Sequence, residues 1–251
     1  MRTLHPAFWT IRSTALVFIS CLFASQASAV SITVGFEGNP GSFVTMSDAM
    51  PGLGCSSAGS EGQLSCVGEN LDNGGWTLND WNLFADPDPT ISNGFSVTNN
   101  TGSTQSFLIS VFLPVSVSFG PPSYIKGSIQ GGATDVNGNG VTLSSTSGFS
   151  MYNAFIDGGS VRTLLDDPQS FSTGLAFDSV NVALSNFGIP VAEVVGVATT
   201  TSLQLDVRFD LSAGDRASFT TVFNVEAVPE PGTALLLGLG LAGLAARRRS
   251  V

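Results

Sequence analysis

Short stretches of alternating apolar and polar residues occupy the chain from Val30 to Val228, and clusters of Gly, Asn, Asp, Ser and Pro separate them. A period of two places successive side chains on opposite faces of a β-strand. The clearest stretch is LQLDVRFDLS, which is apolar at every second position from Leu203 to Leu211. The residues AGD and then RASFTTVFNVEA follow it, which predicts a β-hairpin turning at Gly214.

No segment keeps a helical period, because residues that break helices interrupt every candidate. Many short strands at this spacing predict an all-β fold, a single antiparallel β-sandwich of jelly-roll or Greek-key type. One domain of about 200 residues is usual for such folds. We therefore assign residues 30–227 to one β-sandwich domain, residues 1–29 to a signal peptide and residues 228–251 to a C-terminal tail.

The first residues have the layout of a secretory signal peptide. Two arginines, Arg2 and Arg12, precede or flank an apolar stretch, and the small residues Ala27-Ser28-Ala29 follow it. The stretch is shorter than the roughly 20 apolar residues that span a membrane. We therefore expect export, with cleavage between Ala29 and Val30.

Charge excludes one class of partner. The chain has 19 acidic residues, all between Glu37 and Glu230, and only four basic residues lie in that stretch, a net charge of −15. Binding to a phosphate backbone relies on Lys and Arg. We therefore expect no nucleic-acid partner.

Two cysteines, Cys55 and Cys66, remain after the signal peptide is removed. An even number of cysteines in an exported protein predicts a disulfide. We expect a Cys55–Cys66 bond that closes a Gly- and Ser-rich loop.

Catalytic side chains are scarce in the exported part. The chain's single histidine, His5, lies in the signal peptide, so neither a Ser-His-Asp triad nor a histidine metal site can form there. Enzyme chemistry would have to use carboxylates, as glycosidases do. Turns or a solvent-facing strand explain the available pairs better than catalysis does: Asp86 and Asp88, Asp166 and Asp167, Asp206 and Asp210. We expect a protein that is not an enzyme.

One local pattern has metal-binding character. In TDVNGNGVTL, Asp135, Asn137 and Asn139 precede Gly140, as at the start of a calcium loop. Thr146 stands where that loop needs a bidentate Glu, and an Asn-Gly hairpin turn explains the same residues. We expect no cofactor, with a weak calcium site as the open alternative.

Trp76 and Trp81, in GGWTLNDWNLF, are candidates for stacking on a sugar. On a straight strand, two residues five positions apart point to opposite faces. At least one of the two is therefore expected in the core.

The tail has three parts: Pro229-Glu230-Pro231, an apolar run from Thr233 to Ala246, and Arg247-Arg248-Arg249. The prolines cannot continue a strand. The run has 14 residues, and as a helix it would be about 21 Å long, short of a hydrocarbon core of about 30 Å. We expect a short transmembrane sorting helix that is held only transiently.

This order of parts closely resembles the PEP-CTERM sorting signal of Gram-negative bacteria. The resemblance implies recognition by exosortase, a membrane transpeptidase-like enzyme, cleavage near Pro229-Glu230-Pro231, and delivery from the inner membrane to the cell surface or exopolysaccharide matrix. We thus expect an exported structural or adhesive protein, with exopolysaccharide as a potential partner. The alternative is a carbohydrate-binding or carboxylate-based glycan-active module.

Overall fold

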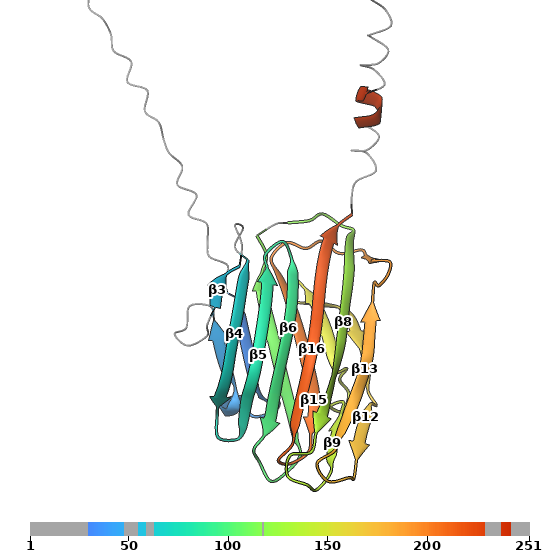
Figure 1. Ribbon diagram of the computed structural model, residues 1–251. Coiled ribbons are helices and arrows are strands. Elements are labelled where there is room, and N and C mark those ends of the chain that lie inside the picture. Colours follow the sequence, from blue (N-terminus) through green and yellow to red (C-terminus); the bar gives the residue numbers. More distant parts are fainter. Residues whose placement is uncertain (1–29, 48–54, 59–62, 117, 229–236, 242–251) are drawn as a thin grey trace, which may run out of the picture.

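Two antiparallel β-sheets face each other and form the body of the protein (Figure 1). The computed structural model describes residues 30–47, 55–58, 63–116, 118–228 and 237–241. This nearly all-β architecture agrees with the β-sandwich that the sequence predicts. Residues 237–241 are helical, and the described part of the chain contains no helix with the length and apolar character that crossing a membrane requires.

The first sheet has β7 and β15 at its centre. Its strand order is β11 (Gly159–Leu164), β10 (Tyr152–Ile156), β15 (Ser202–Leu211), β7 (Gln105–Pro114), β1 (Ser31–Phe36) and β2 (Val44–Ser47), and the 3₁₀ turn η1 (Pro40–Ser42) precedes β2. Beside this path, β9 (Val141–Ser144) pairs with β15 and with β12 (Ser170–Thr173).

The second sheet has β6 and β16 at its centre. Its order is β13 (Ser179–Phe187), β8 (Ser123–Thr134), β16 (Arg216–Ala227), β6 (Thr90–Asn99), β5 (Trp76–Asp86), β4 (Leu64–Asp72) and β3 (Cys55–Ser57). A short strand, β14 (Glu193–Val195), also pairs with β8.

A row of phenylalanine rings joins the two sheets through the core. In the first sheet, Phe107 lies 5.0 Å from Phe36 and 5.4 Å from Phe209, measured between ring centroids. Phe209 lies 5.0 Å from Phe219 of the second sheet, and Phe219 lies 5.7 Å from Phe95. Aromatic pairs of this kind contribute about 0.5–1.5 kcal/mol each beyond the area they bury. The row therefore holds β6 and β16 firmly against the first sheet.

The hairpin predicted at Gly214 is wrong. The strand β15 pairs with β7, β10 and β9 in the first sheet, whereas β16 pairs with β6 and β8 in the second. Gly214, with φ of +75°, turns the chain from one sheet to the other. The apolar faces of the two strands then oppose each other across the core, where Phe209 meets Phe219. Alternation predicts the buried face of each strand but not which strand lies beside it.

Asn99 holds this crossing in place. It ends β6, where the chain also crosses between the sheets toward β7, and its side chain is fully buried. Its amide nitrogen donates to the carbonyls of Ser103, Leu211 and Ser212 at 2.9–3.1 Å, and its amide oxygen accepts from the backbone and hydroxyl of Thr101. One side chain thus links both crossings.

Candidate functional site: a polar groove across the second sheet

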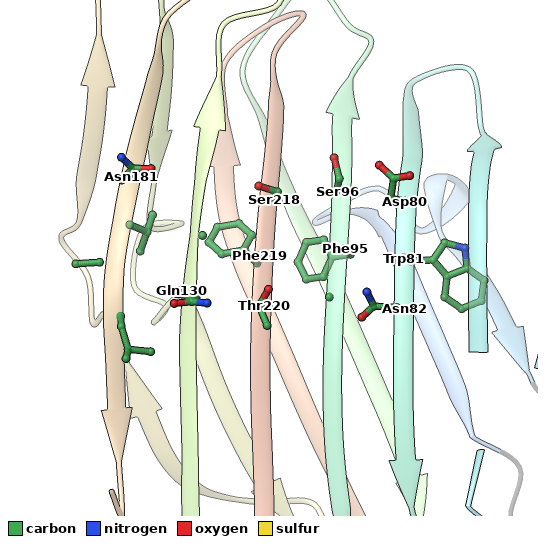
Figure 2. A pocket seen from close by; sticks show the side chains of 15 residues that line it. Asp80, Trp81, Asn82, Phe95, Ser96, Gln130, Asn181, Ser218, Phe219 and Thr220 are labelled. Carbon is green, nitrogen blue, oxygen red and sulfur yellow. The ribbon is translucent and has the colours of Figure 1, made fainter. Parts of the chain in front are cut away.

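A shallow polar groove crosses the outer face of the second sheet (Figure 2). It has a volume of about 640 Å³ and extends over β5, β6, β16, β8 and β13. Neighbouring strands lie about 4.8 Å apart, so the groove is about 19 Å long across the strands. Amides, hydroxyls and one carboxylate line most of it: Asp80, Asn82, Ser96, Gln130, Asn181, Ser218 and Thr220. The β13 end is apolar, because Ala183 and the exposed side chain of Leu184 line it.

The groove is hollow because the two central strands carry small residues on their outer face. These are Gly94 and Ser96 on β6 and Ser218 and Thr220 on β16. The flanking strands carry longer side chains at the same level (Figure 2). A Cβ atom at Gly94 would lie 2.7 Å from Oδ1 of Asn82, so this glycine leaves room for the Asn82 amide.

The floor beneath these residues is rigid. Phe95 and Phe219 alternate with the outward-facing polar residues of β6 and β16 and are 5% and 2% exposed. Their contact belongs to the row of rings that joins the sheets. The backbone that carries the polar residues is therefore held in place from below, whereas their side chains remain free to rotate.

The polar side chains of the groove have no hydrogen-bond partner among the residues that the structure describes. Polar residues close by are paired: Thr98, two positions after Ser96, donates to Asn79 at 2.7 Å and accepts from Arg216. Each amide offers one acceptor and two donors, and each hydroxyl offers both functions. The groove therefore presents a set of unused donors and acceptors.

The β5 end of the groove is acidic. Glu69 on β4 lies directly opposite Asp80 in the strand register. Both line a second, smaller hollow of about 350 Å³ on the other side of β5. Like charges at opposite positions repel each other, so an anion is disfavoured at this end.

The predicted disulfide is confirmed. Cys55 and Cys66 are bonded, and they are directly opposite residues of β3 and β4. The bond fastens the edge strand β3 to the second sheet, beyond the acidic end of the groove.

Both tryptophans lie in the core. Trp76 and Trp81 are 0% and 5% exposed, and the Trp76 indole donates to the carbonyl of Ser42 at 3.1 Å. The prediction that they point to opposite faces fails because a bulge between Leu78 and Asp80 shifts the alternation of β5 by one residue. Neither indole presents a free ring face, so stacking of a sugar on either one would require the core to open.

The Asp135 loop is closed on itself. The carboxylate of Asp135 is 2% exposed and accepts hydrogen bonds from the backbone amides of Asn137, Gly138, Gly140 and Phe177. Burial raises the pKa of Asp135, whereas the hydrogen bonds from these amides lower it. The amides have the larger effect together, so the pKa lies below its usual value.

The Asn137 side chain of this loop is already hydrogen-bonded. Asn137 donates to the carbonyl of Ala213 at 2.7 Å and accepts from the backbone of Asn139. In the described part of the chain there is no group of three or more His, Cys, Asp or Glu that could hold a metal ion. The local pattern that suggests a calcium loop here builds a turn stabilised by backbone amides.

Five of the six carboxylates considered for catalysis, all except Asp88, accept local hydrogen bonds from described residues. Their donors are Gln63 and the backbone of Asp88 for Asp86, Ser150 for Asp166, Ser145 and Gly148 for Asp167, Gln204 for Asp206 and Thr146 for Asp210. The Ser150 and Ser145 hydroxyls hold the pKa values of Asp166 and Asp167 below the usual range. The sequence predicts a solvent-facing Asp206, but this residue is only 3% exposed, because the side chains of Gln204 and Arg208 contact it.

The targeting residues lie mostly outside the described residues. This holds for Ala27 and Ala29, for Pro229, Glu230 and Pro231, and for Arg247, Arg248 and Arg249. Val30 is described: it is 2% exposed and precedes β1 directly.

Comparison with known proteins identifies the tail. A family model described as the PEP-CTERM protein-sorting motif matches residues 227–249. The matched segment begins at the last residue of β16. No curated protein matches the chain. The chain therefore carries a PEP-CTERM protein-sorting motif, which marks it as an exported protein that is sorted through exosortase.

Proposed function

We propose that this protein is a non-enzymatic structural or adhesive component of the cell surface or exopolysaccharide matrix. The observation that carries the proposal is the sorting motif at residues 227–249, directly after the last strand of the sandwich. The tail holds the protein at the inner membrane transiently, exosortase cuts near Pro229-Glu230-Pro231, and the body is released to the outside.

The hydrogen bonds of the body support a structural role. A general acid needs a carboxyl group whose pKa is raised toward the working pH. The carboxyls of Asp166 and Asp167 have lowered pKa values, and their acceptor oxygens are used by neighbouring hydroxyls and amides. Burial raises the pKa of Asp215, but this side chain is fully buried and accepts hydrogen bonds from Ser212 and the backbone of Val136, so a substrate does not reach it. These groups stabilise loops of the sandwich.

The intact mass of the protein recovered from the surface or medium of the producing cells tests the proposal. We expect a chain that starts at Val30, ends near Pro229-Glu230-Pro231 and lacks two hydrogens because of the Cys55–Cys66 bond. Added mass at the new C-terminus would identify a surface carrier.

The control for this measurement is a pair of matched proline variants. Replacement of Pro229 and Pro231 by Ala should leave the tail uncut, whereas Pro89→Ala, outside the motif, should not affect processing. A wild-type chain that still ends at Val251 would show that the tail is a lasting anchor, and the proposal would fail.

A second candidate function is favoured by the groove on the second sheet. Its unpaired amides and hydroxyls suit a carbohydrate-binding module better than a hydrolase, because it contains one carboxylate, Asp80, and a glycosidase uses two flanking its substrate.

A further inference from the structure

We propose that the groove on the second sheet binds a segment of an uncharged polysaccharide. The groove itself is independent of the tail, but the choice of a polysaccharide as partner rests on the proposed delivery to the surface or matrix. The body would then be attached to the matrix non-covalently through the outer face of β5, β6, β16, β8 and β13.

The chemistry of the lining residues fits sugar hydroxyls. Each hydroxyl of a sugar donates one hydrogen bond and accepts others, as the groove's side chains do. The amides of Asn82, Gln130 and Asn181 can each donate and accept, so that each can pair with two neighbouring hydroxyls. These groups lack partners among the described residues, so a ligand need not break existing hydrogen bonds within the protein.

The shape of the groove fits a chain of sugars. It crosses five strands over about 19 Å, which suits several linked rings better than one. The small central residues Ser96, Ser218 and Thr220 leave room for rings to lie flat above the sheet. The packed rings of Phe95 and Phe219 hold the backbone of β6 and β16 in place, so a ligand does not have to order the sheet itself.

The charge of the groove selects an uncharged ligand. Its one charged lining residue is Asp80, and Glu69 faces Asp80 across β4 and β5. The whole exported body carries a net charge of −15 between Glu37 and Glu230. An anionic polysaccharide is therefore repelled, whereas Asp80 can accept two hydrogen bonds from the hydroxyls of a neutral one.

Affinity should be modest, because the aromatic rings at the groove are buried. Phe95, Phe219 and Trp81 are at most 5% exposed, so they add little stacking area. Binding must come mainly from hydrogen bonds that replace those to water, each of small net value.

Calorimetric titration of the full chain, purified in mild detergent, tests the proposal. The probes are linear hexasaccharides of glucose, mannose and galactose, with a hexamer of galacturonic acid as the anionic comparison. Ser218→Phe fills the centre of the groove, and Asn82→Ala removes one amide. Ser128→Phe, on β8 but outside the groove, is the matched control, and the melting temperature of each variant shows whether it folds.

We expect at least one neutral hexasaccharide to bind with a millimolar or lower dissociation constant, and galacturonate not to bind. Ser218→Phe should weaken binding at least tenfold because it fills the groove, Asn82→Ala should weaken it about two- to tenfold because it removes one amide, and Ser128→Phe should not weaken it. Absence of binding to all three neutral probes, or equal binding by wild type and Ser218→Phe, would overturn the proposal. Neither result changes the intact mass expected for the processed protein. Failure of the polysaccharide proposal can therefore be distinguished from failure of the sorting assignment.

Discussion

Replacement of Asn99 tests whether one buried amide secures the two crossings between the sheets. Asn99→Ala removes every hydrogen bond of that side chain: those to the carbonyls of Ser103, Leu211 and Ser212, and those from Thr101. The residue is fully buried, so water does not replace these partners without a rearrangement of the links.

The expected loss follows from the number of groups left without a partner. A net hydrogen bond contributes about 1 kcal/mol, and a buried polar group without a partner costs about 1–3 kcal/mol. We therefore expect Asn99→Ala to lower the free energy of unfolding by about 3 kcal/mol. In a domain of this size this corresponds to a fall in melting temperature of about 6–12 °C.

Asn99→Asp is a second, more specific test. It keeps the shape of the side chain and replaces only the donating NH₂ group by an oxygen. A carboxylate would face three carbonyl oxygens in a buried site, which raises its folded pKa above the unfolded value of about 3.9. A raised folded pKa means that stability is present at low pH and is lost as the pH rises through the folded pKa. The Asp variant should therefore be closer to wild type in acidic buffer than in neutral buffer.

Thermal unfolding followed by circular dichroism measures these changes. The control is Asn100→Ala, the adjacent residue, whose amide makes an exposed hydrogen bond to Thr77; we expect a loss of about 0.5 kcal/mol or less there. The reasoning would be refuted if Asn99→Ala and Asn100→Ala had equal effects, or if Asn99→Asp were no less stable than wild type at neutral pH.

Three further predictions concern other parts of the body. Reduction of the Cys55–Cys66 bond, or its replacement by two serines, should lower the free energy of unfolding by about 2–3 kcal/mol, because the bond closes a short loop; an unchanged denaturant midpoint would contradict this. Although burial raises the pKa of Asp157, the backbone amides of Thr200, Thr201 and Ser202 and the hydroxyls of the two threonines lower it well below 3.8. Its contribution, about 1 kcal/mol after solvent screening, should be present above pH 4 and lost as the pH falls through the folded pKa. The melting curves of Asp157→Asn and wild type should converge in acid, because Asn tolerates the positive φ of this residue and removes only the charge. Addition of calcium should leave the melting temperature unchanged, because backbone amides already occupy the Asp135 carboxylate; a rise with calcium, reversed by a chelator, would show a site there.

The two-residue period predicts strands and buried faces well, because it depends only on local side-chain alternation. From Leu203 to Leu211 every second residue is fully buried, as expected for β15. The disulfide was predictable too, because it depends on the number of cysteines and on export. A bulge, by contrast, leaves no clear mark in the sequence, and one extra residue in β5 was enough to bring Trp81 to the same side as Trp76.

Strand neighbours were not predictable, and the groove depends on them. Its small residues come from segments far apart in the chain, at Gly94 and Ser96 on β6 and at Ser218 and Thr220 on β16. Each segment alone looks like an ordinary strand with a polar outer face. The hollow exists only because the crossings at Asn99 and Gly214 bring β6 and β16 side by side in the second sheet. Sequence signals of this site are thus visible only after the strand order is known.

The positions of the strands explain how one chain can carry both a stable fold and a removable tail. The strand β1 begins at Ser31, directly after the expected cleavage before Val30, and β16 ends at Ala227, where the sorting motif begins. A cut near Pro229 leaves all twelve residues of β16 paired with β8 and the strand also paired with β6. The residues that form the β-sandwich and the residues of the sorting motif therefore overlap only at Ala227. Processing can release the sandwich with its core, disulfide and outer groove complete.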